Sequence, residues 1–124
     1  MKIENIKFKA KRLDNREWVE GNLMKESYGA RIIEHTSKAD NWIAVDPSTV
    51  CQFTGLKDCE RKEIWEGDII EDDYKTEIVF DQGAFLIHSI ANNGKETFHP
   101  LFNYIEWNGN ITCKVIGNKF DKNK

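Results

Sequence analysis

The stretch from Asp46 to Glu71 limits most strongly what this chain can fold into. It reads DPSTVCQFTGLKDCERKEIWEGDIIE. A proline turn, a short apolar strand, a glycine turn, a charged tip and a second strand entered through Glu66-Gly67-Asp68 follow one another within it. The stretch predicts short strands joined by tight turns, and we expect the residues on either side to pair with it as sheet.

Individual residues explain the bends in this stretch. Because proline fixes its own φ and disfavours helical geometry in the residue before it, Asp46 is expected to be extended. Its carboxylate can then accept hydrogen bonds from backbone N–H groups downstream and cap one helical turn at 47–49. Beyond this turn we expect a strand at 50–53, a positive φ at Gly55 within a connection at 54–58, and an exposed charged tip at 57–62.

Apolar and basic side chains alternate at the start of the chain, with Ile6, Phe8 and Ala10 on one side and Lys7, Lys9 and Lys11 on the other. This period of two is typical of a strand with one buried face. Turn residues follow at 13–16 and 27–29. They predict further strands at 17–23, 30–34 and 42–45, with a polar loop at 35–41 before the last of them.

The second half of the chain continues in the same manner. Asp81-Gln82-Gly83 joins apolar runs at 75–80 and 84–90 and predicts a hairpin with a left-handed glycine. The segment 98–104 is expected to form one helical turn or an irregular link, before a closing strand at 112–116. Several short strands with little helix indicate an all-β fold, a small barrel or roll rather than a layered α/β domain.

Composition sets limits on class and compartment. A chain of 124 residues suits one domain, and 40% apolar with 31% charged residues is typical of a soluble protein with a modest core. No apolar run has signal-peptide or membrane-helix length, so we expect a cytoplasmic protein without a membrane partner. The three cysteines, Cys51, Cys59 and Cys113, cannot all pair within one chain, which favours a reducing compartment.

Carboxylates gather in and after the bend at Gly67, namely Asp68, Glu71, Asp72 and Asp73. They could bind a hard cation or serve acid–base chemistry. The run lacks the spaced ligands and central glycine of an EF-hand loop, which favours a solvated acidic turn that serves as a docking patch. At the bend itself we favour a structural interpretation, in which Gly67 permits the turn and Asp68 holds it through backbone hydrogen bonds.

The cysteines and histidines predict no metal or cofactor site. Cys51 and Cys59 are too widely spaced for a zinc knuckle, and the three histidines lie in separate elements. No spacing suggests a catalytic cysteine beside a histidine. We therefore expect no cofactor and no enzyme activity.

One surface has a phosphate-binding character, the basic N-terminal face of Lys7, Lys9, Lys11, Arg12 and Arg16. Phe8 and Trp18 interleave with these cations, as on surfaces that bind nucleic acids. The alternative, which we favour, is a solvated edge strand whose lysines prevent edge-to-edge aggregation.

Four motifs occur in a fixed order along the chain: IKFKAKR at the start, VDPSTVCQFTGLKDCERKEIWEGDII in the centre, the hairpin IVFDQGAFLI, and VIGN at Val115 to Asn118. This combination resembles the YopX-like family of phage and prophage proteins of Gram-positive bacteria over nearly the whole chain. The resemblance implies an all-β unit built around an SH3-type barrel, with a small N-terminal β lobe.

The resemblance also implies a division of the chain. Residues 1–45 would form the N-terminal β lobe, residues 46–118 the SH3-like barrel core, packed with the lobe as one compact unit, and residues 119–124 a frayed tail. The bends at the junction would be set by a structural motif of Asp46, Pro47, Gly55, Gly67 and Asp68.

Members of this family are generally of unknown function, and nucleic-acid binding is suggested for them by structural analogy. We expect a phage- or prophage-derived, non-enzymatic interaction module in the bacterial cytoplasm, which self-associates as a homo-oligomer or binds a protein partner. A thin core and edge strands that a short chain cannot cover favour self-association. Nucleic-acid binding through the basic N-terminal face is the alternative, and a metal-dependent enzyme using Asp68 with residues 71–73 is the least favoured.

Overall fold

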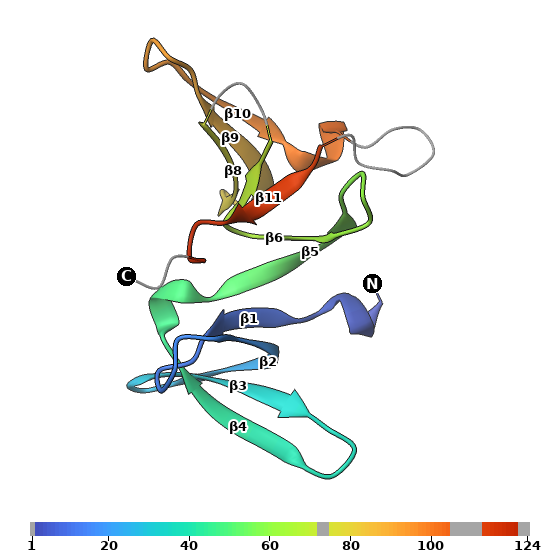
Figure 1. The fold of residues 1–124 in the computed structure, drawn as a ribbon, viewed down its shortest axis with the longest axis vertical. Helices are drawn as coiled ribbons and strands as arrows, with labels where there is room; N and C mark the ends of the chain where they lie inside the picture. Colours follow the sequence, from blue (N-terminus) through green and yellow to red (C-terminus); the bar gives the residue numbers. More distant parts are fainter. Residues whose placement is uncertain (1, 72–74, 105–112, 122–124) are drawn as a thin grey trace. The chain divides into compact units, whose positions relative to one another are not determined.

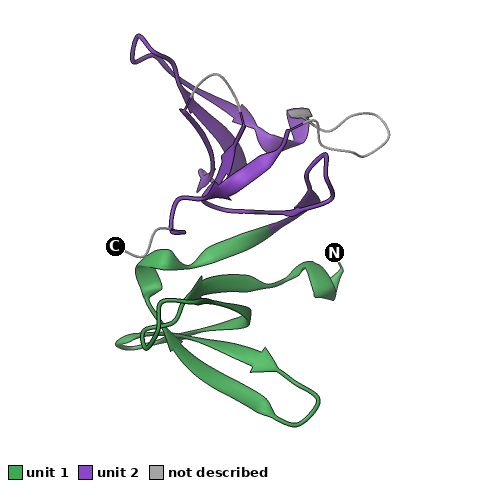
Figure 2. Ribbon diagram, in the orientation of Figure 1, with its two compact units in different colours: residues 1–53, 123 green, residues 54–122, 124 purple. Residues whose placement is uncertain are grey.

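The computed structural model describes residues 2–71, 75–104 and 113–121. In these residues the protein consists of strands, three short 3-10 turns and no α-helix, so the all-β prediction is confirmed. The strands form two antiparallel sheets, neither of which closes into a barrel within the described part (Figure 1). The chain divides into two compact units, residues 1–53 (unit 1) and residues 54–122 (unit 2), coloured separately in Figure 2. No helix within the described ranges is long and apolar enough to cross a membrane.

Unit 1 is a meander of hairpins. It contains η1 (Ile3–Asn5), β1 (Phe8–Lys11), β2 (Trp18–Glu26), β3 (Gly29–His35), β4 (Asp40–Val45) and η2 (Pro47–Thr49), and β5 (Cys51–Lys57) begins in it. The strands follow the order β4-β3-β2-β1-β5. The strands predicted at the start of the chain, at 17–23 and at 30–34 are confirmed.

The proline turn forms as predicted. Asp46 is extended (φ −76°, ψ 113°), and its Oδ1 accepts a hydrogen bond of 3.0 Å from the backbone N–H of Ser48 in η2. By contrast, the loop predicted at 35–41 was wrong at both ends, because His35 pairs with Asp40 across the β3–β4 hairpin. Nδ1 of His35 lies 2.7 Å from Oδ1 of Asp40, and this contact extends both strands into the predicted loop.

The core of unit 1 is small and apolar. Phe8 and Ala10 lie on the predicted inner face of β1, whereas Ile6 is exposed because β1 begins only at Phe8. Gly21 of β2 has no room for a side chain, since a Cβ atom would overlap the backbone carbonyl of Ile33 on β3. The buried members of the core are Ala10, Val19, Ile32 and Val45, and Phe8, Leu23, Ala30, Ile43 and Val50 pack against them.

Unit 2 is built from shorter strands. It contains the end of β5, then β6 (Glu63–Trp65), β7 (Asp68–Ile70), β8 (Lys75–Asp81), β9 (Ala84–Ile90), β10 (Glu96–Pro100), η3 (Leu101–Tyr104) and β11 (Val115–Asn118). Its own sheet has the order β10-β9-β8-β7-β11, so the last strand of the chain pairs with β7. Ile64, Ile70, Ile78, Ile87, Leu101 and Val115 form the buried core.

The turns of unit 2 follow the glycines. Gln82 (φ 51°) and Gly83 (φ 79°) both lie in the left-handed region, as expected for a two-residue turn in the predicted β8–β9 hairpin. Gly67 has a φ of 86° at the predicted bend between β6 and β7. Gly55 has the predicted positive φ, 85°, but it lies inside β5, which runs on to Lys57. The connection predicted at 54–58 was therefore wrong, because the glycine conformation is accommodated within the strand.

Two further elements differ from the prediction in extent. The segment 98–104 forms the end of β10 as well as the helical turn η3, because Pro100 occupies the last position of an edge strand, where it is tolerated. The closing strand, predicted at 112–116, begins at Val115 and continues to Asn118, with an irregular register between Val115 and Gly117. Thr112 lies outside the described residues.

Candidate interaction site

Two lysines of the predicted basic face lie over one aromatic ring. Nζ of Lys9 is 4.5 Å and Nζ of Lys11 4.7 Å from the ring centroid of Trp18, across the β1–β2 ladder. Lys11 is only 3% exposed. The period-two pattern therefore placed both lysines correctly on one face of β1, but this face is largely covered rather than fully solvated.

The remaining cations of this face are paired with carboxylates: Lys7 with Glu20 (3.1 Å), Arg12 with Asp14 (2.8 Å) and Arg16 with Asp46 (3.0 Å). Arg12 donates from both Nε and Nη2, and this hydrogen bonding lowers the pKa of Asp14 below its ordinary value. Hydrogen bonds from Ser48 and then from Arg16 likewise lower the pKa of Asp46. A phosphate would have to displace these carboxylates to reach the cations, and nucleic-acid binding by this face stays a prediction.

The predicted acidic patch is divided between a buried and an exposed carboxylate. Asp68 is 2% exposed, and its two oxygens accept hydrogen bonds from the backbone N–H of Trp65 (2.7 Å) and from the side-chain amide of Asn118 (2.9 Å). Asp68 therefore holds the bend and does not face solvent. Glu71 is exposed, and Asp72 and Asp73 lie outside the described residues. Where the structure describes the chain, no three His, Cys, Asp or Glu side chains are grouped to hold a metal ion.

A second buried aspartate, Asp58, holds the tip that was predicted to be exposed. It is 4% exposed. Its Oδ1 accepts hydrogen bonds of 2.8 Å from the N–H groups of Glu60 and Lys62, and its Oδ2 accepts one of 2.9 Å from Val115 of β11. Burial raises the pKa of Asp58, but the three hydrogen bonds outweigh burial and hold it below the ordinary value. The neighbouring residues of the tip, 59–62, are exposed as predicted.

The outer edge of β4 is an open sheet edge of unit 1. β4 is the terminal strand of its sheet, and β3 is its neighbour on the inner side. At its C-terminal end, Val45 forms a bridge with Arg12 and the carbonyl of Ala44 accepts a hydrogen bond from Leu13. No strand of the described residues covers the outer edge at 40–43.

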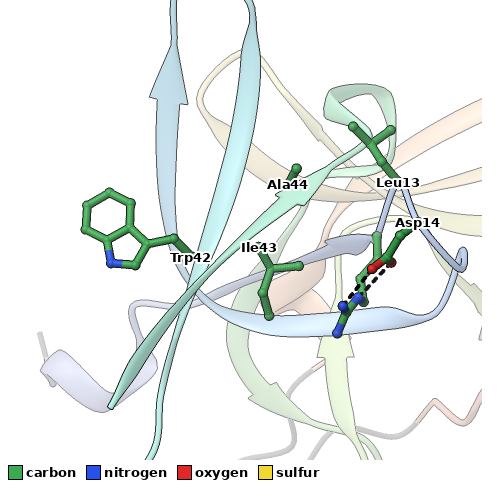
Figure 3. A pocket seen from close by; sticks show the side chains of 6 residues that line it. Leu13, Asp14, Trp42, Ile43 and Ala44 are labelled. Atoms are coloured by element: carbon green, nitrogen blue, oxygen red, sulfur yellow. Dashed lines mark hydrogen bonds and ion pairs between the residues drawn. The ribbon is translucent and has the colours of Figure 1, made fainter.

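A large aromatic side chain and a shallow hollow mark this edge. Trp42 is 51% exposed and Leu13 is 59% exposed. Figure 3 shows Trp42 and Ile43 pointing to opposite sides of β4, as expected for consecutive strand residues. The hollow has a volume of about 220 Å³ and is lined by Arg12, Leu13, Asp14, Trp42, Ile43 and Ala44. The backbone groups of the sheet edge, exposed apolar side chains and the ion pair between Arg12 and Asp14 therefore lie close together at this edge.

One of the two edge strands in the sheet of unit 2, β10, is better protected against pairing. It begins with the charged Glu96 and ends with Pro100, which has no N–H to donate. Its exposed Phe98 stacks on His88 of β9, with ring centroids 4.3 Å apart and planes at 1°. Oε1 of Glu96 also lies 2.7 Å from Nε2 of His88. Glu96 and Phe98 of β10 thus both contact His88 of their own sheet.

A comparison with family models identifies the relatives of the chain. The model described as YopX protein matches residues 7–124, nearly the whole chain. The chain belongs to the YopX family. A comparison with curated proteins gave no match, and neither did a comparison with solved structures.

Sequence reasoning missed two residues that matter in this YopX-family chain. It placed Trp42 in a strand but assigned it no role, because a sequence does not show which strand lies at a sheet edge. It placed Asp58 in an exposed tip because charged residues surround it on the C-terminal side. The available signal at Asp58 was its ability to accept hydrogen bonds from N–H groups two to four residues downstream, which aspartates often do in turns.

Proposed function

We propose that this YopX-family chain is a non-enzymatic interaction module that self-associates, and that two copies meet at the outer edge of β4. The proposal includes a phage or prophage origin and a place in the bacterial cytoplasm. The observation that carries it is the edge at 40–43, which lacks a partner strand in the described ranges and presents the half-exposed Trp42. Such an edge offers N–H and C=O groups to another strand, and the indole adds apolar contact area.

The sequence of β4 suits pairing with a second copy. In an antiparallel arrangement centred on Trp42, the two indoles would face each other, and Asn41 would face Ile43 of the second copy, so Asp40 would lie at the end of the paired stretch. The single formal charge of the strand would then oppose no like charge. Cross-strand aromatic pairs contribute roughly 0.2–1 kcal/mol each, in addition to the backbone hydrogen bonds.

The proposal keeps the SH3-type barrel for the second part of the chain. The order of elements in unit 2 supports it: β8, β9 and β10 form a meander, the 3-10 turn η3 follows, and β11 then pairs with β7. In an SH3-type barrel, the last strand likewise follows a single helical turn and pairs with the first strand. Because a fold of this kind hosts many functions, it supports the architecture and not the choice of partner.

Nucleic-acid binding is the second candidate, and the contacts of its predicted surface weaken it. Three cations of that surface are paired with carboxylates, and Lys9 and Lys11 lie over Trp18. The protein also carries a net charge of −3, which opposes phosphate backbones at long range. A metal-dependent enzyme has less support still, because the buried Asp68 is engaged in holding its bend.

Light scattering coupled to size-exclusion chromatography tests self-association of the full chain at micromolar concentration. Wild type is expected to elute as an oligomer, and Trp42→Lys is expected to raise the dissociation constant about tenfold or more, because it places charge in the contact. Tyr28→Lys is the matched control, since Tyr28 is an exposed aromatic residue of unit 1 that lies in a turn rather than on the β4 edge.

The outcomes separate the alternatives. Dissociation by Trp42→Lys with an intact Tyr28→Lys oligomer supports the β4 contact, provided that circular dichroism shows both variants folded. A strict wild-type monomer would overturn self-association, and an oligomer unaffected by Trp42→Lys would overturn this surface. Salt-sensitive retardation of DNA or RNA that Lys9→Glu abolishes would favour the nucleic-acid candidate instead.

A further inference from the structure

Two of the three cysteines are neighbours in unit 2. Cys59 lies in the turn after β5, and Cys113 lies two residues before the start of β11. The backbone N–H of Cys59 donates a hydrogen bond of 3.0 Å to the carbonyl of Cys113. Because the N–H and the C=O group each lie next to a Cα atom, this hydrogen bond keeps the two Cα atoms within about 7 Å, the limit for a disulfide bridge.

The contacts around this pair hold the two segments together. Asp58, the residue before Cys59, accepts the hydrogen bond from Val115, two residues after Cys113. Nζ of Lys114 also lies 3.8 Å from a carboxylate oxygen of Glu60. A hydrogen bond to the residue before Cys59 and an ion pair to the residue after it therefore tie the turn around Cys59 to the segment that follows Cys113.

The two thiols differ in their access to solvent. Cys59 is exposed, whereas Cys113 is half-buried, and both are free thiols. Burial raises the pKa of Cys113 to about 11, and the nearby Asp58 carboxylate and Cys59 thiol add to the shift. Cys59 is thus the thiol that an oxidant reaches first, and Cys113 is the thiol that reacts second.

We propose that Cys59 and Cys113 form a reversible disulfide, a redox modification site that locks the tip at 58–62 to the start of β11. The oxidant is a low-molecular-weight disulfide of the glutathione class. The Cys59 thiolate attacks one sulfur of the oxidant, forms a mixed disulfide and releases one thiol. Cys113 then loses its proton, attacks the sulfur of Cys59 and releases the second thiol. Two protein thiols are oxidised by two electrons, and one small disulfide is reduced to two thiols.

The third cysteine provides an internal comparison. Cys51 is buried in the first sheet, and its thiol donates a hydrogen bond of 3.3 Å to the backbone carbonyl of Thr49. A buried thiol of this kind is inert toward small oxidants. Oxidation is therefore expected at Cys59 and Cys113 while Cys51 remains reduced.

To test the proposal, the reduced full chain is treated with oxidised glutathione, and the remaining thiols are then alkylated. The protein is digested without reductant, and the peptides are identified by mass spectrometry. Wild type is expected to give a peptide that links Cys59 to Cys113, with Cys51 alkylated, and dithiothreitol is expected to remove the link. Cys51→Ser is the matched control, and it is expected to give the same linked peptide. Cys113→Ser should stop at the mixed disulfide on Cys59, and Cys59→Ser should remain free of adducts.

The acidity of Cys113 gives a second measurement, which does not depend on substitutions. Because the attacking species is the thiolate, closure of the mixed disulfide is expected to accelerate about tenfold per pH unit between neutral pH and the pKa of Cys113. A stable mixed disulfide on wild-type Cys59, a link from Cys59 to Cys51, or links only between molecules would each overturn the proposal. A closure rate independent of pH would overturn the assignment of Cys113 as the second nucleophile.

Discussion

Aspartates hold turns in both units, but unit 1 places them at the surface and unit 2 places them in the interior. In unit 1, Asp14 binds the guanidinium of Arg12 at an exposed turn. Asp46 caps η2 through Ser48 and pairs with Arg16, and its side chain remains 27% exposed. Each of these carboxylates thus has a cationic partner and contact with water.

The aspartates of unit 2 have a different set of partners. Asp58 accepts hydrogen bonds from three backbone N–H groups, and Asp68 accepts them from Trp65 and from the amide of Asn118. Both are nearly fully buried. In each case one of these donors belongs to β11, namely Val115 for Asp58 and Asn118 for Asp68. The last strand is therefore held by carboxylates that lie far from it in the sequence.

This difference in burial determines how much each carboxylate contributes to the stability of the fold. An exposed ion pair contributes little, because water competes for both charges and the side chains lose freedom. A buried carboxylate that accepts several hydrogen bonds is costly to remove, because its donors are left without partners in a place that water does not reach. Unit 2 is therefore expected to be much more sensitive than unit 1 to the loss of a turn-holding aspartate.

The largest expected effect is that of Asp68→Ala. It removes the acceptor of the Trp65 N–H and one acceptor of the Asn118 amide, so the free energy of unfolding should fall by about 3 kcal/mol. Urea denaturation measures the loss, and hydrogen exchange should show it in β6, β7 and β11. Asp81→Ala, at an exposed hairpin position of the same unit, is the control and should change stability little. An equal loss in both variants would break the comparison between buried and exposed aspartates.

Sequence reasoning predicts the bend that Asp68 holds, but it does not predict the distant residue that binds Asp68. The bend at Gly67 and the role of Asp68 could be predicted, because both depend on residues within three positions of each other. The partner of Asp68, Asn118, could not be predicted, because it approaches only when β11 pairs with β7. Asp58 was assigned to a solvated tip for the same reason, since its burial depends on Val115, 57 positions away.

The same limit applies to unit 1. Alternation predicted correctly that Lys9 and Lys11 share a face, since period two is a local property of the strand. It could not show that the carboxylate of Asp46 would lie beside Arg16, 30 positions before it. Nor could it show that β4 is an edge strand, because strand order is a property of the whole sheet. Turns and strands were therefore predictable, whereas the pairing of charges and the open surface were not.

The second prediction concerns the loss of folding stability at low pH. The folded-state pKa of Asp58 lies below its ordinary value of 3.8, so its contribution to stability is complete above that value and is lost as pH falls through the lower, folded pKa. Asp58→Asn keeps one acceptor oxygen and should destabilise the neutral-pH protein by about 1–2 kcal/mol. It should also lose less stability than wild type on acidification below about pH 4.

Urea denaturation at neutral and acid pH checks this prediction, with Glu71→Gln as an exposed control in the same unit. The control should show the acid sensitivity of wild type. If Asp58→Asn retained the full acid sensitivity as well, the buried carboxylate would not be the group that responds to pH, and the contrast between the units would have to rest on Asp68 alone.

The smallest effect is expected at Asp46. Asp46→Ala removes the acceptor of the Ser48 N–H at the start of η2 and should cost about 1 kcal/mol, as for other capping residues. Asp46→Asn keeps a capping oxygen but loses the ion pair to Arg16, and it should be close to wild type, because an exposed pair contributes little. Urea denaturation of both variants separates the cap from the charge. If Asp46→Ala cost as much as Asp68→Ala, exposure would not be what distinguishes the aspartates of the two units.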